Sequence, residues 1–522
     1  MPSHPWARNF SVEKGDLDYL TNLLLEKETP LSTEALAREL VDKRLTREAA
    51  DIKERFKDTQ LYNPSRAYEV GQKLLFQAFD YAPGTVVNVR PGNNHEYGTF
   101  NVIGVKFDDN DKVREFASEL STPHKLTQES TNGDNPLTAT PEYTTDEIIS
   151  NWRGDIVPVL EKVLAASSDL VSIGGTWFPR ELMLEVNAGH LNLAEAVLDI
   201  AGGGPLTTDE ILEQIGGLGK APYELQKFTL NYALRDDSRF DEVGPTGQVL
   251  WYLTRLEPQE VMQVPPNLRY TPFDYDRSLL APDLVTLETE IDDELSPAFG
   301  VPEVGDSVTI TLNYPHRRVG TLPLTARIRQ IVPTALKTQR VWMNLVDGQD
   351  GEETTGWVVR NEGYIFGLSA FYRKHRLPVG AYVTVKRSDD PTRIVVDFNA
   401  HRPRTEYVRL IVPKNDQILF ENHKRSIGAE YDDLMILGVD ELQAVDALFQ
   451  STQQQRKSIS SILKSIMPGL SRLTPQGTIH AKTLYSVFNV FRRCPPGPIF
   501  ATLVANPDFQ NVGGHYWKLV ED

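Results

Sequence analysis

The sequence predicts a multidomain protein of the α+β class. Its 522 residues are enough for three to five domains. Apolar residues recur at helical spacing in some segments and alternate with polar residues in others, so helical and strand-rich regions follow one another. One pattern, a capped helix start followed by helices and a glycine-rich hairpin, occurs more than once. These observations favour several small domains over one large core.

The clearest copy of this pattern spans residues 205–253. Thr207 is a candidate N-cap, and two acids follow it in the first turn, where the helix dipole favours them. A glycine-rich break then precedes a second helix over 222–234, and a hairpin ends near Trp251. Helices followed by a hairpin are typical of a winged helix-turn-helix.

Parts of the pattern recur along the chain. The tails at 170–177 and 509–517 join an apolar residue, a glycine turn and a tryptophan, as 240–251 does. The polar helix start recurs at 32–34 and 144–147. Heads and tails lie roughly 30 to 45 residues apart, which fits one small domain per repeat. We therefore expect the three tryptophans of the tails to close hydrophobic cores.

Residues 205–253 resemble the winged-helix family shared by the bacterial RNA polymerase delta subunit, additional-sex-combs-like chromatin proteins and some restriction endonucleases. The string PLTTDEIL at 205–212 and the spacing from Arg239-Phe240 to Trp251 carry the resemblance. The glycine run at 216–219 departs from the family pattern. The resemblance implies a transcription or chromatin setting, in which some members bind DNA and others act through proteins.

The same criteria divide the rest of the chain. Short strands with Gly, Asn and Asp turns predict a small SH3-like barrel, which would bind peptides or nucleic acid or space its neighbours. Segments rich in Pro, Ser, Thr or acids predict linkers. The expected parts are a helical, helix-turn-helix-like domain (14–66), the SH3-like barrel (67–120), a linker (121–142), a winged-helix-like unit (143–189), a winged helix (190–256), an acidic, Pro-rich linker (257–299), a basic β-rich domain (300–436) and a C-terminal winged-helix-like domain (437–522).

Charge is unevenly distributed. The chain has a net charge of −18, but residues 300–414 hold 17 Lys and Arg against 11 Asp and Glu. We expect strands there at 307–312, 325–332, 340–346, 356–359, 381–386 and 393–398, and a helix at 368–375. The strings at 357–360 and 364–385 resemble the DNA-binding pseudobarrel of plant auxin-response-type factors, although Ala381 replaces the usual acid.

Nucleic-acid binding requires cations on a surface that follows the phosphates. The candidates in the basic domain are Arg317, Arg318, Arg327, Arg329, Lys337, Arg340, Arg373, Lys374, Arg376, Lys386, Arg387, Arg402 and Arg404. Arg327 and Arg329 are expected on one face of a strand. The winged helices add Lys227, beside Gln226 and Asn231, and Lys482, Arg492, Arg493 and Lys518. The alternative is a solvated face whose charges serve solubility.

Signals of catalysis are weak. The sequence has no Walker A, His-Glu-x-x-His or Gly-x-Ser-x-Gly motif, and the acidic run 288–294 is expected to be a solvated linker. The lone Cys494 excludes an internal disulfide, and no apolar run is long enough for a membrane span. We expect a cytoplasmic, non-enzymatic protein that needs no cofactor or metal and contacts no membrane.

Two interpretations of function follow. The first is a DNA-binding protein of transcription regulation or chromosome organisation, led by phosphate contacts from the basic domain and the winged helices. The alternative is an interaction scaffold that docks on RNA polymerase or on a defence or restriction complex. A related possibility is the recognition part of a restriction-type system, which would need a separate nuclease.

Overall fold

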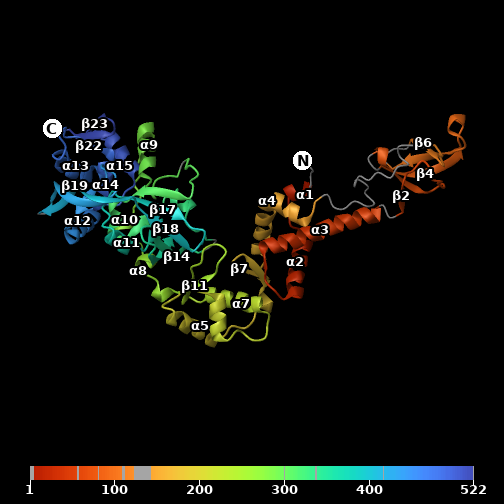
Figure 1. Cartoon of the computed structure of the whole chain (residues 1–522), viewed down its shortest axis with the longest axis horizontal. Helices are drawn as coiled ribbons and strands as arrows, with labels where there is room; N and C mark the ends of the chain where they lie inside the picture. The colour runs from red at the N-terminus through yellow and green to blue at the C-terminus, as the bar shows by residue number, and fades with distance from the viewer. Residues whose placement is uncertain are drawn as a thin grey trace. The chain divides into compact units, whose positions relative to one another are not determined.

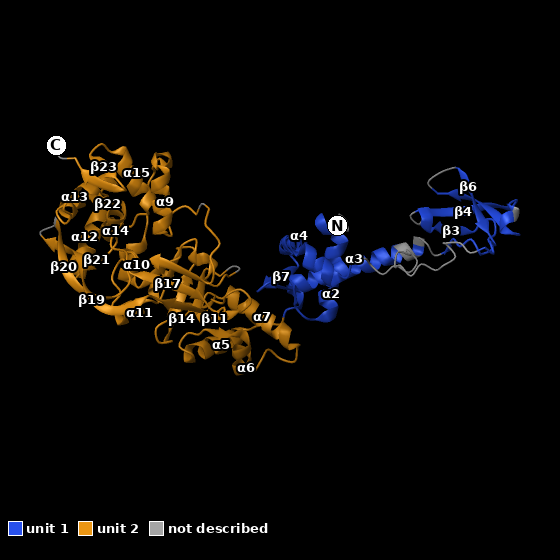
Figure 2. Ribbon diagram, turned by 45° about the horizontal axis from the view of Figure 1, so that its top comes forward, with its two compact units in different colours: residues 1–183 blue, residues 184–522 orange. Residues whose placement is uncertain are grey.

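The computed structural model describes residues 5–55, 58–79, 82–108, 112–122, 143–298, 300–335, 338–414 and 417–520. Helices and sheets are mixed along the chain, which confirms the predicted α+β class (Figure 1). The chain divides into two compact units, Met1–Met183 and Leu184–Asp522 (Figure 2). Within the described ranges, every helix is too short or too polar to cross a bilayer.

The first unit contains a three-stranded sheet and four helices that share one core. The elements are α1 (Pro5–Arg8), α2 (Lys14–Lys27), β1 (Leu31–Ser32), α3 (Thr33–Arg55), α4 (Thr145–Ala166), β7 (Leu170–Ile173) and β8 (Thr176–Pro179). The strand order is β1-β8-β7, and Leu31 pairs with Trp177. The Trp177 Nε1–H donates to Thr33 Oγ1 at 2.9 Å. The ranges 14–66 and 143–189, expected to be separate domains, therefore share one sheet and one core, although residues 59–62 belong to the second sheet described next.

A second sheet lies between α3 and α4 in the sequence. Its strands are β2 (Thr59–Leu61), β3 (Lys73–Phe76), β4 (Ala82–Pro91), β5 (Asn101–Phe107) and β6 (Val113–Ser118), in that order across the sheet. Tyr62, Phe76, Phe107 and Phe116 form an aromatic cluster in its core. The strand-rich character expected of 67–120 is present, with β2 added at its start. The expected linker 121–142 lies, from residue 123 on, outside the described residues.

The arrangement of the first unit recurs around residues 188–253. Its elements are α5 (Ala188–Ile200), β9 (Leu206–Thr207), α6 (Thr208–Ile215), α7 (Tyr223–Asp236), β10 (Phe240–Glu242) and β11 (Leu250–Leu253), and the strand order is β9-β11-β10. Thr207 caps α6 through a capping box with Glu210. Trp251 is 1% exposed, and its Nε1–H donates to Asn231 Oδ1 at 2.8 Å.

A third copy forms the C-terminal part. Its elements are α13 (Ile459–Ser471), β22 (Ile479–His480), α14 (Ala481–Phe491), α15 (Pro496–Ala505), β23 (Phe509–Gly513) and β24 (Tyr516–Leu519), with strand order β22-β24-β23, and α12 (Leu442–Gln454) packs on α14. We call the three copies tri-helical units 1, 2 and 3. A numbered unit is always one of these three, and the two compact units of Figure 2 are called the first and the second unit. The helix start at Thr144, expected to open a repeat, instead caps the third helix of unit 1.

The basic domain is a seven-stranded sheet. Its strands are β12 (Ser307–Thr311), β13 (Thr321–Pro323), β14 (Arg340–Asp347), β15 (Glu353–Val359), β16 (Tyr364–Phe366), β17 (Tyr382–Arg387) and β18 (Arg393–Asp397), and its helices are α10 (Tyr314–Val319) and α11 (Ser369–Lys374). The order is β12-β17-β18-β14-β15-β16-β13, with β14 and β18 parallel. Five of the six expected strands and the expected helix are present.

The exception is the expected strand at 325–332. Residues Ile328–Gln330 form a 3₁₀ helix, whose start is fixed by hydrogen bonds to Thr325. Ile328, Ile331 and Val332 are all buried, and their i, i+3, i+4 spacing is helical. Arg327 and Arg329 therefore do not share a strand face.

The expected linker 257–299 is packed into the second unit. It contains α8 (Gln259–Met262) and α9 (Pro282–Ile291), and Leu284, Leu287 and Ile291 are buried in the core that includes unit 3. α9 lies beside α15 (Figure 1). The acidic run is also partly buried, because Glu288, Asp293 and Glu294 have almost no exposed side-chain surface.

A long hairpin joins the seven-stranded sheet to unit 3. It consists of β19 (Ala400–Lys414) and β20 (Gln417–Ala429), and β21 (Leu437–Val439) adds a third strand in the order β20-β19-β21. No strand was expected here, because buried and exposed side chains alternate only over part of its length.

Candidate nucleic-acid interface

Five of the phosphate contacts predicted in the basic domain form ion pairs within the protein. The pairs are Arg318 with Asp446 (2.5 Å), Arg327 with Asp292 (2.8 Å), Arg340 with Asp241 (2.6 Å), Lys386 with Asp397 (2.6 Å) and Lys374 with three acids. A cation held by a carboxylate has less free energy to gain from a phosphate. The local excess of positive charge therefore overstates the cationic surface of this domain.

Arg340 connects tri-helical unit 2 to the seven-stranded sheet. It also lies 2.8 Å from the carboxylate of Glu257, whose side chain is fully buried. Burial, and then the nearby Asp241, raise the pKa of Glu257 to about 8. A backbone hydrogen bond from Trp342 to Val243, 2.9 Å long, joins the same two parts. Arg340 is thus a structural residue of this junction.

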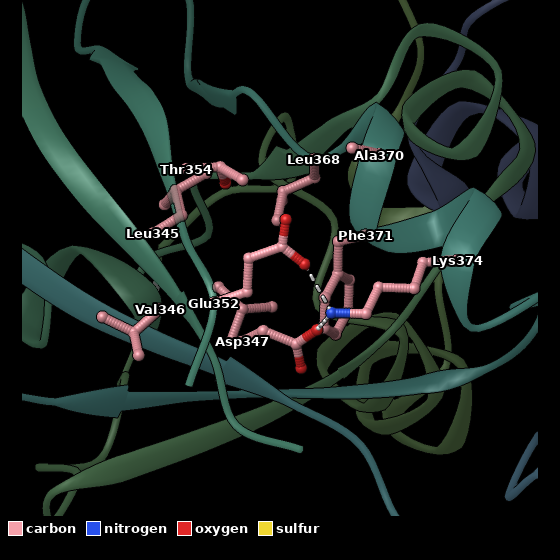
Figure 3. A pocket seen from close by; sticks show the side chains of 10 residues that line it. Leu345, Val346, Asp347, Glu352, Thr354, Leu368, Ala370, Phe371 and Lys374 are labelled. Carbon is pink, nitrogen blue, oxygen red and sulfur yellow. Dashed lines mark hydrogen bonds and ion pairs between the residues drawn. The ribbon is translucent and has the colours of Figure 1, made fainter. Parts of the chain in front are cut away.

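Lys374 lies in a small acidic cavity (Figure 3). Its Nζ is 2.8 Å from Asp347, 2.5 Å from Asp350 and 2.7 Å from Glu352. The cavity measures about 240 Å³, and its other walls are mainly apolar. Burial alone would raise the pKa of Asp347, but the hydrogen bonds from Lys374 and from His375 lower it below the ordinary value. The charged groups that line the cavity therefore pair with one another.

Arg493, a predicted DNA contact, is buried. Its guanidinium is 2.7 Å from both Asp293 and Glu294, and Tyr485 donates to the same Asp293. Glu294 also pairs with His316 at 3.0 Å. This network ties the acidic segment, the basic domain and unit 3 together. Arg493 has no surface to offer to a phosphate.

The other predicted residues of unit 3 differ in exposure. Lys482 lies 3.3 Å from Asp432 and 3.4 Å from Glu290. Arg492 donates to a backbone oxygen and lies over the ring of Phe273. Lys518 is exposed on β24.

The third helices of the tri-helical units have no net positive charge. In α7, Gln226 and Asn231 are buried and hydrogen-bonded within the unit, and Lys227 is 2.6 Å from Asp209. α15 contains no charged residue and packs against α9. The residues predicted as base contacts are thus structural. Burial of this kind depends on tertiary packing and is not readable from helix periodicity.

The remaining predicted cations of the basic domain make few contacts within the protein or are exposed. Arg329 and Arg387 donate to the backbone oxygens of Arg360 and Gln330. Lys337 lies outside the described residues. Arg402 and Arg404 are exposed on β19.

The hairpin β19–β20 carries several exposed cations, among them Arg402, Arg404 and Lys424. Residues 400–429 hold six Lys and Arg against three Asp and Glu, a net charge of +3 in an acidic chain. Tyr407 is 63% exposed and pairs directly across the hairpin with Lys424, whose Nζ lies 5.4 Å from the ring centre. Tyr407 and Lys424 were not predicted, because only the strand pairing places them on one face with solvent. Cations beside an exposed aromatic ring can contact phosphates and stack on bases.

The other face of the hairpin borders a cavity that contains four predicted residues. Arg317 and Arg318 of α10, Arg373 of α11 and Arg376 after it line this cavity together with Arg425 of β20. The sequence thus indicated four of its five arginines. Arg425 was missed because it lies beyond the region counted as basic.

No metal site is evident, since the described ranges contain no suitable cluster of His, Cys, Asp or Glu. Comparisons with protein-family models, curated proteins and solved structures find no match to this chain.

Proposed function

We propose that this chain is a non-catalytic, cytoplasmic DNA-binding protein of transcription regulation or chromosome organisation. The observation that carries the proposal is the exposed cationic hairpin β19–β20, where Arg402, Arg404 and Lys424 are exposed and Lys424 lies over the ring of the exposed Tyr407. The major groove of DNA is wide enough for a two-stranded β-ribbon. Such a hairpin would place its cations along the phosphates.

The proposal assigns the tri-helical units to the winged-helix class. Their common element order, and the tryptophan that closes each core, support this assignment. We likewise assign the sheet β2–β6 as SH3-like and the seven-stranded sheet as a pseudobarrel. The third helices of the three winged-helix units have no net positive charge, which favours a structural or protein-docking role for these units.

The test is DNA binding by the full chain, measured as fluorescence anisotropy of a labelled duplex at low salt. The variant Arg402→Gln/Arg404→Gln/Lys424→Gln removes three exposed cations. Each phosphate contact is worth close to tenfold in affinity at 0.1 M salt, so binding should weaken about 100-fold or more.

The matched control is Lys220→Gln/Arg456→Gln/Lys457→Gln, which removes three exposed cations elsewhere in the same unit. It changes the net charge equally and should weaken binding by less than about threefold, because none of these three residues belongs to the hairpin β19–β20. Equal losses in the two variants would refute the assignment of the hairpin.

One observation favours the alternative, a scaffold that docks on RNA polymerase or on a defence or restriction complex. On α5, Leu193 is 51% and Ile200 is 86% exposed, seven residues apart on one helix face. An apolar face of this kind is suited to a protein partner. If docking is the function, Leu193→Gln/Ile200→Gln should abolish co-purification of polymerase subunits and leave DNA binding unchanged.

A further inference from the structure

The arginine-lined cavity has the properties of a ligand site. It lies between α10, α11, the hairpin strand β20, β21 and the start of α12, and it measures about 460 Å³. This volume is within the range of small-molecule pockets. Because its walls come from the seven-stranded sheet domain, the hairpin and the α12 region, it exists only in the assembled second unit.

Five arginines line the cavity, and carboxylates neutralise only two of them. Arg318 pairs with Asp446, and Arg425 pairs with Asp440. Among the described residues, no carboxylate pairs with Arg317, Arg373 or Arg376. The cavity thus has an excess of three positive charges.

The orientation of two of these arginines leaves donors for a ligand. Arg317 uses its Nε to bond the backbone oxygen of Leu377 at 2.6 Å, and Arg373 uses its Nε to bond that of Ser369 at 3.2 Å. Their terminal Nη groups form no further hydrogen bond within the described ranges. Fixing a guanidinium by its Nε reduces the entropy lost when Nη groups bind a ligand.

One feature of the cavity is unfavourable without an anion. Burial, and also the proximity of Arg373, lower the pKa of Arg317. A bound anion would compensate these neighbouring positive charges. The left-handed conformation of Arg376, with φ of 51°, belongs to the C-cap of α11, because the Leu377 N–H donates to the oxygen of Tyr372 and the Arg376 N–H to that of Arg373.

Tyr314 adds an unpaired donor. It lines the cavity and is 2% exposed, and its hydroxyl makes no hydrogen bond of good geometry within the described part of the chain, although Arg318 lies close to it. Burial raises the pKa of this hydroxyl, which therefore keeps its proton and can donate. A buried polar group of this type usually has a partner.

The charge and the lining define the ligand class. A phosphate monoester carries close to two negative charges at pH 7 and three acceptor oxygens, and arginine binds it bidentately. A carboxylate or an internal phosphodiester carries one charge and would leave two guanidinium groups uncompensated. Bare phosphate would not fill the apolar part of the wall, formed by Leu377, Val379, Val408, Ile427, Leu437 and Leu442.

We propose that this cavity binds a nucleoside monophosphate group, supplied either as a free nucleotide or as the 5′-phosphorylated end of a nucleic-acid strand. The phosphate would contact Arg317, Arg373 and Arg376, and the nucleoside would contact the apolar wall. None of the hairpin cations Arg402, Arg404 and Lys424 lines this cavity, and the site does not depend on the proposed function.

The test is calorimetric titration of the full chain with AMP and with adenosine. AMP should bind with at least tenfold higher affinity than adenosine, because the phosphate supplies the charge. Arg373→Gln/Arg376→Gln should lower AMP affinity at least tenfold, and Tyr314→Phe should lower it severalfold. Both arginines are exposed at the cavity rim, so the double variant should keep the wild-type circular dichroism spectrum and melting temperature.

Two variants serve as controls. Lys220→Gln/Lys457→Gln makes the same charge change elsewhere and should leave AMP affinity unchanged. The hairpin variant Arg402→Gln/Arg404→Gln/Lys424→Gln should also leave it unchanged, so failure of this site and failure of the proposed function are distinguishable. Undetectable AMP binding at millimolar concentration, equal binding of adenosine, or equal loss in variant and control would overturn the proposal.

A second arm identifies the source of the phosphate. A tetranucleotide with a 5′-phosphate should displace AMP, and the same tetranucleotide with a 5′-hydroxyl should not, if the site takes strand ends. If neither displaces AMP, the site takes the free nucleotide. Displacement by both equally would contradict a monoester site.

Discussion

The buried cation Arg493 allows a quantitative test of how the second unit is held together. Its side chain is fully buried and neutralises Asp293 and Glu294, each 2.7 Å away. Arg493→Met keeps an unbranched side chain but leaves two buried carboxylates without their cation. Removing one partner of a buried ion pair costs about 3–5 kcal/mol. We expect a loss of this size in the unfolding free energy of the unit Leu184–Asp522.

The pH dependence of this loss provides a second signature. Burial opposes ionisation of Glu294, but Arg493 and His316 hold its pKa well below the ordinary value. In the wild type, this carboxylate therefore contributes stability at and above pH 4.5, which is lost as pH falls toward the lowered pKa. In the variant the pKa should be raised, so stability should fall as pH rises through 4.5. The difference between the two proteins should be larger at pH 7 than at pH 4.

The assay is urea unfolding followed by tryptophan fluorescence at both pH values. The neighbouring variant Arg492→Met is the control, since Arg492 is only partly buried and makes one hydrogen bond and a ring contact, worth about 1 kcal/mol. Arg493→Met/Asp293→Asn/Glu294→Gln should recover part of the loss. A loss at Arg493 no larger than that at Arg492, or one independent of pH, would refute the argument.

Two further predictions concern other buried groups. The pKa of Glu257 is raised to about 8, so the folded protein keeps a proton that the unfolded chain releases above pH 4.5. The unfolding free energy therefore falls as the pH rises from 4.5 to 8. Glu257→Gln should remove this pH dependence in thermal unfolding, and a variant with the wild-type profile would contradict the assignment. Trp251→Phe should cost about 1 kcal/mol more than Trp517→Phe, because Trp251 donates to buried Asn231, whereas Trp517 Nε1 has no partner in the described structure. Equal losses in urea unfolding would show that the Trp251 hydrogen bond contributes nothing.

Local periodicity is enough to predict most helices and strands but not which of them pair or pack together. The cap at Thr207, the hairpin at Trp251 and five strands of the basic domain are local patterns, and they are present. The pairing of Leu31 with Trp177 spans a whole inserted sheet, and no short window of sequence contains it. The helix start at Thr144 was therefore assigned to a new domain, although it continues the first.

The local charge count identifies the basic region but does not show which of its cations are accessible. The acids that neutralise Arg318, Arg340 and Arg493 lie about 100 to 200 residues away along the chain. Local counts do not reveal such pairs, so the basic region appeared more accessible than it is. The same distance explains why 257–299 was expected to be solvated. In contrast, four arginines of the cavity were indicated because they form short basic clusters in the sequence, although only α11 of their two helices was predicted.

The central claim, that the hairpin contacts DNA phosphates, is tested most directly by the salt dependence of binding. The logarithm of the association constant falls linearly with the logarithm of salt concentration, by about 0.9 for each phosphate contact with duplex DNA. Anisotropy titrations between 50 and 200 mM salt should therefore give a slope smaller by up to about 2.7 for Arg402→Gln/Arg404→Gln/Lys424→Gln than for the wild type. The charge-matched control Lys220→Gln/Arg456→Gln/Lys457→Gln should keep the wild-type slope. An unchanged slope in the hairpin variant would contradict the account.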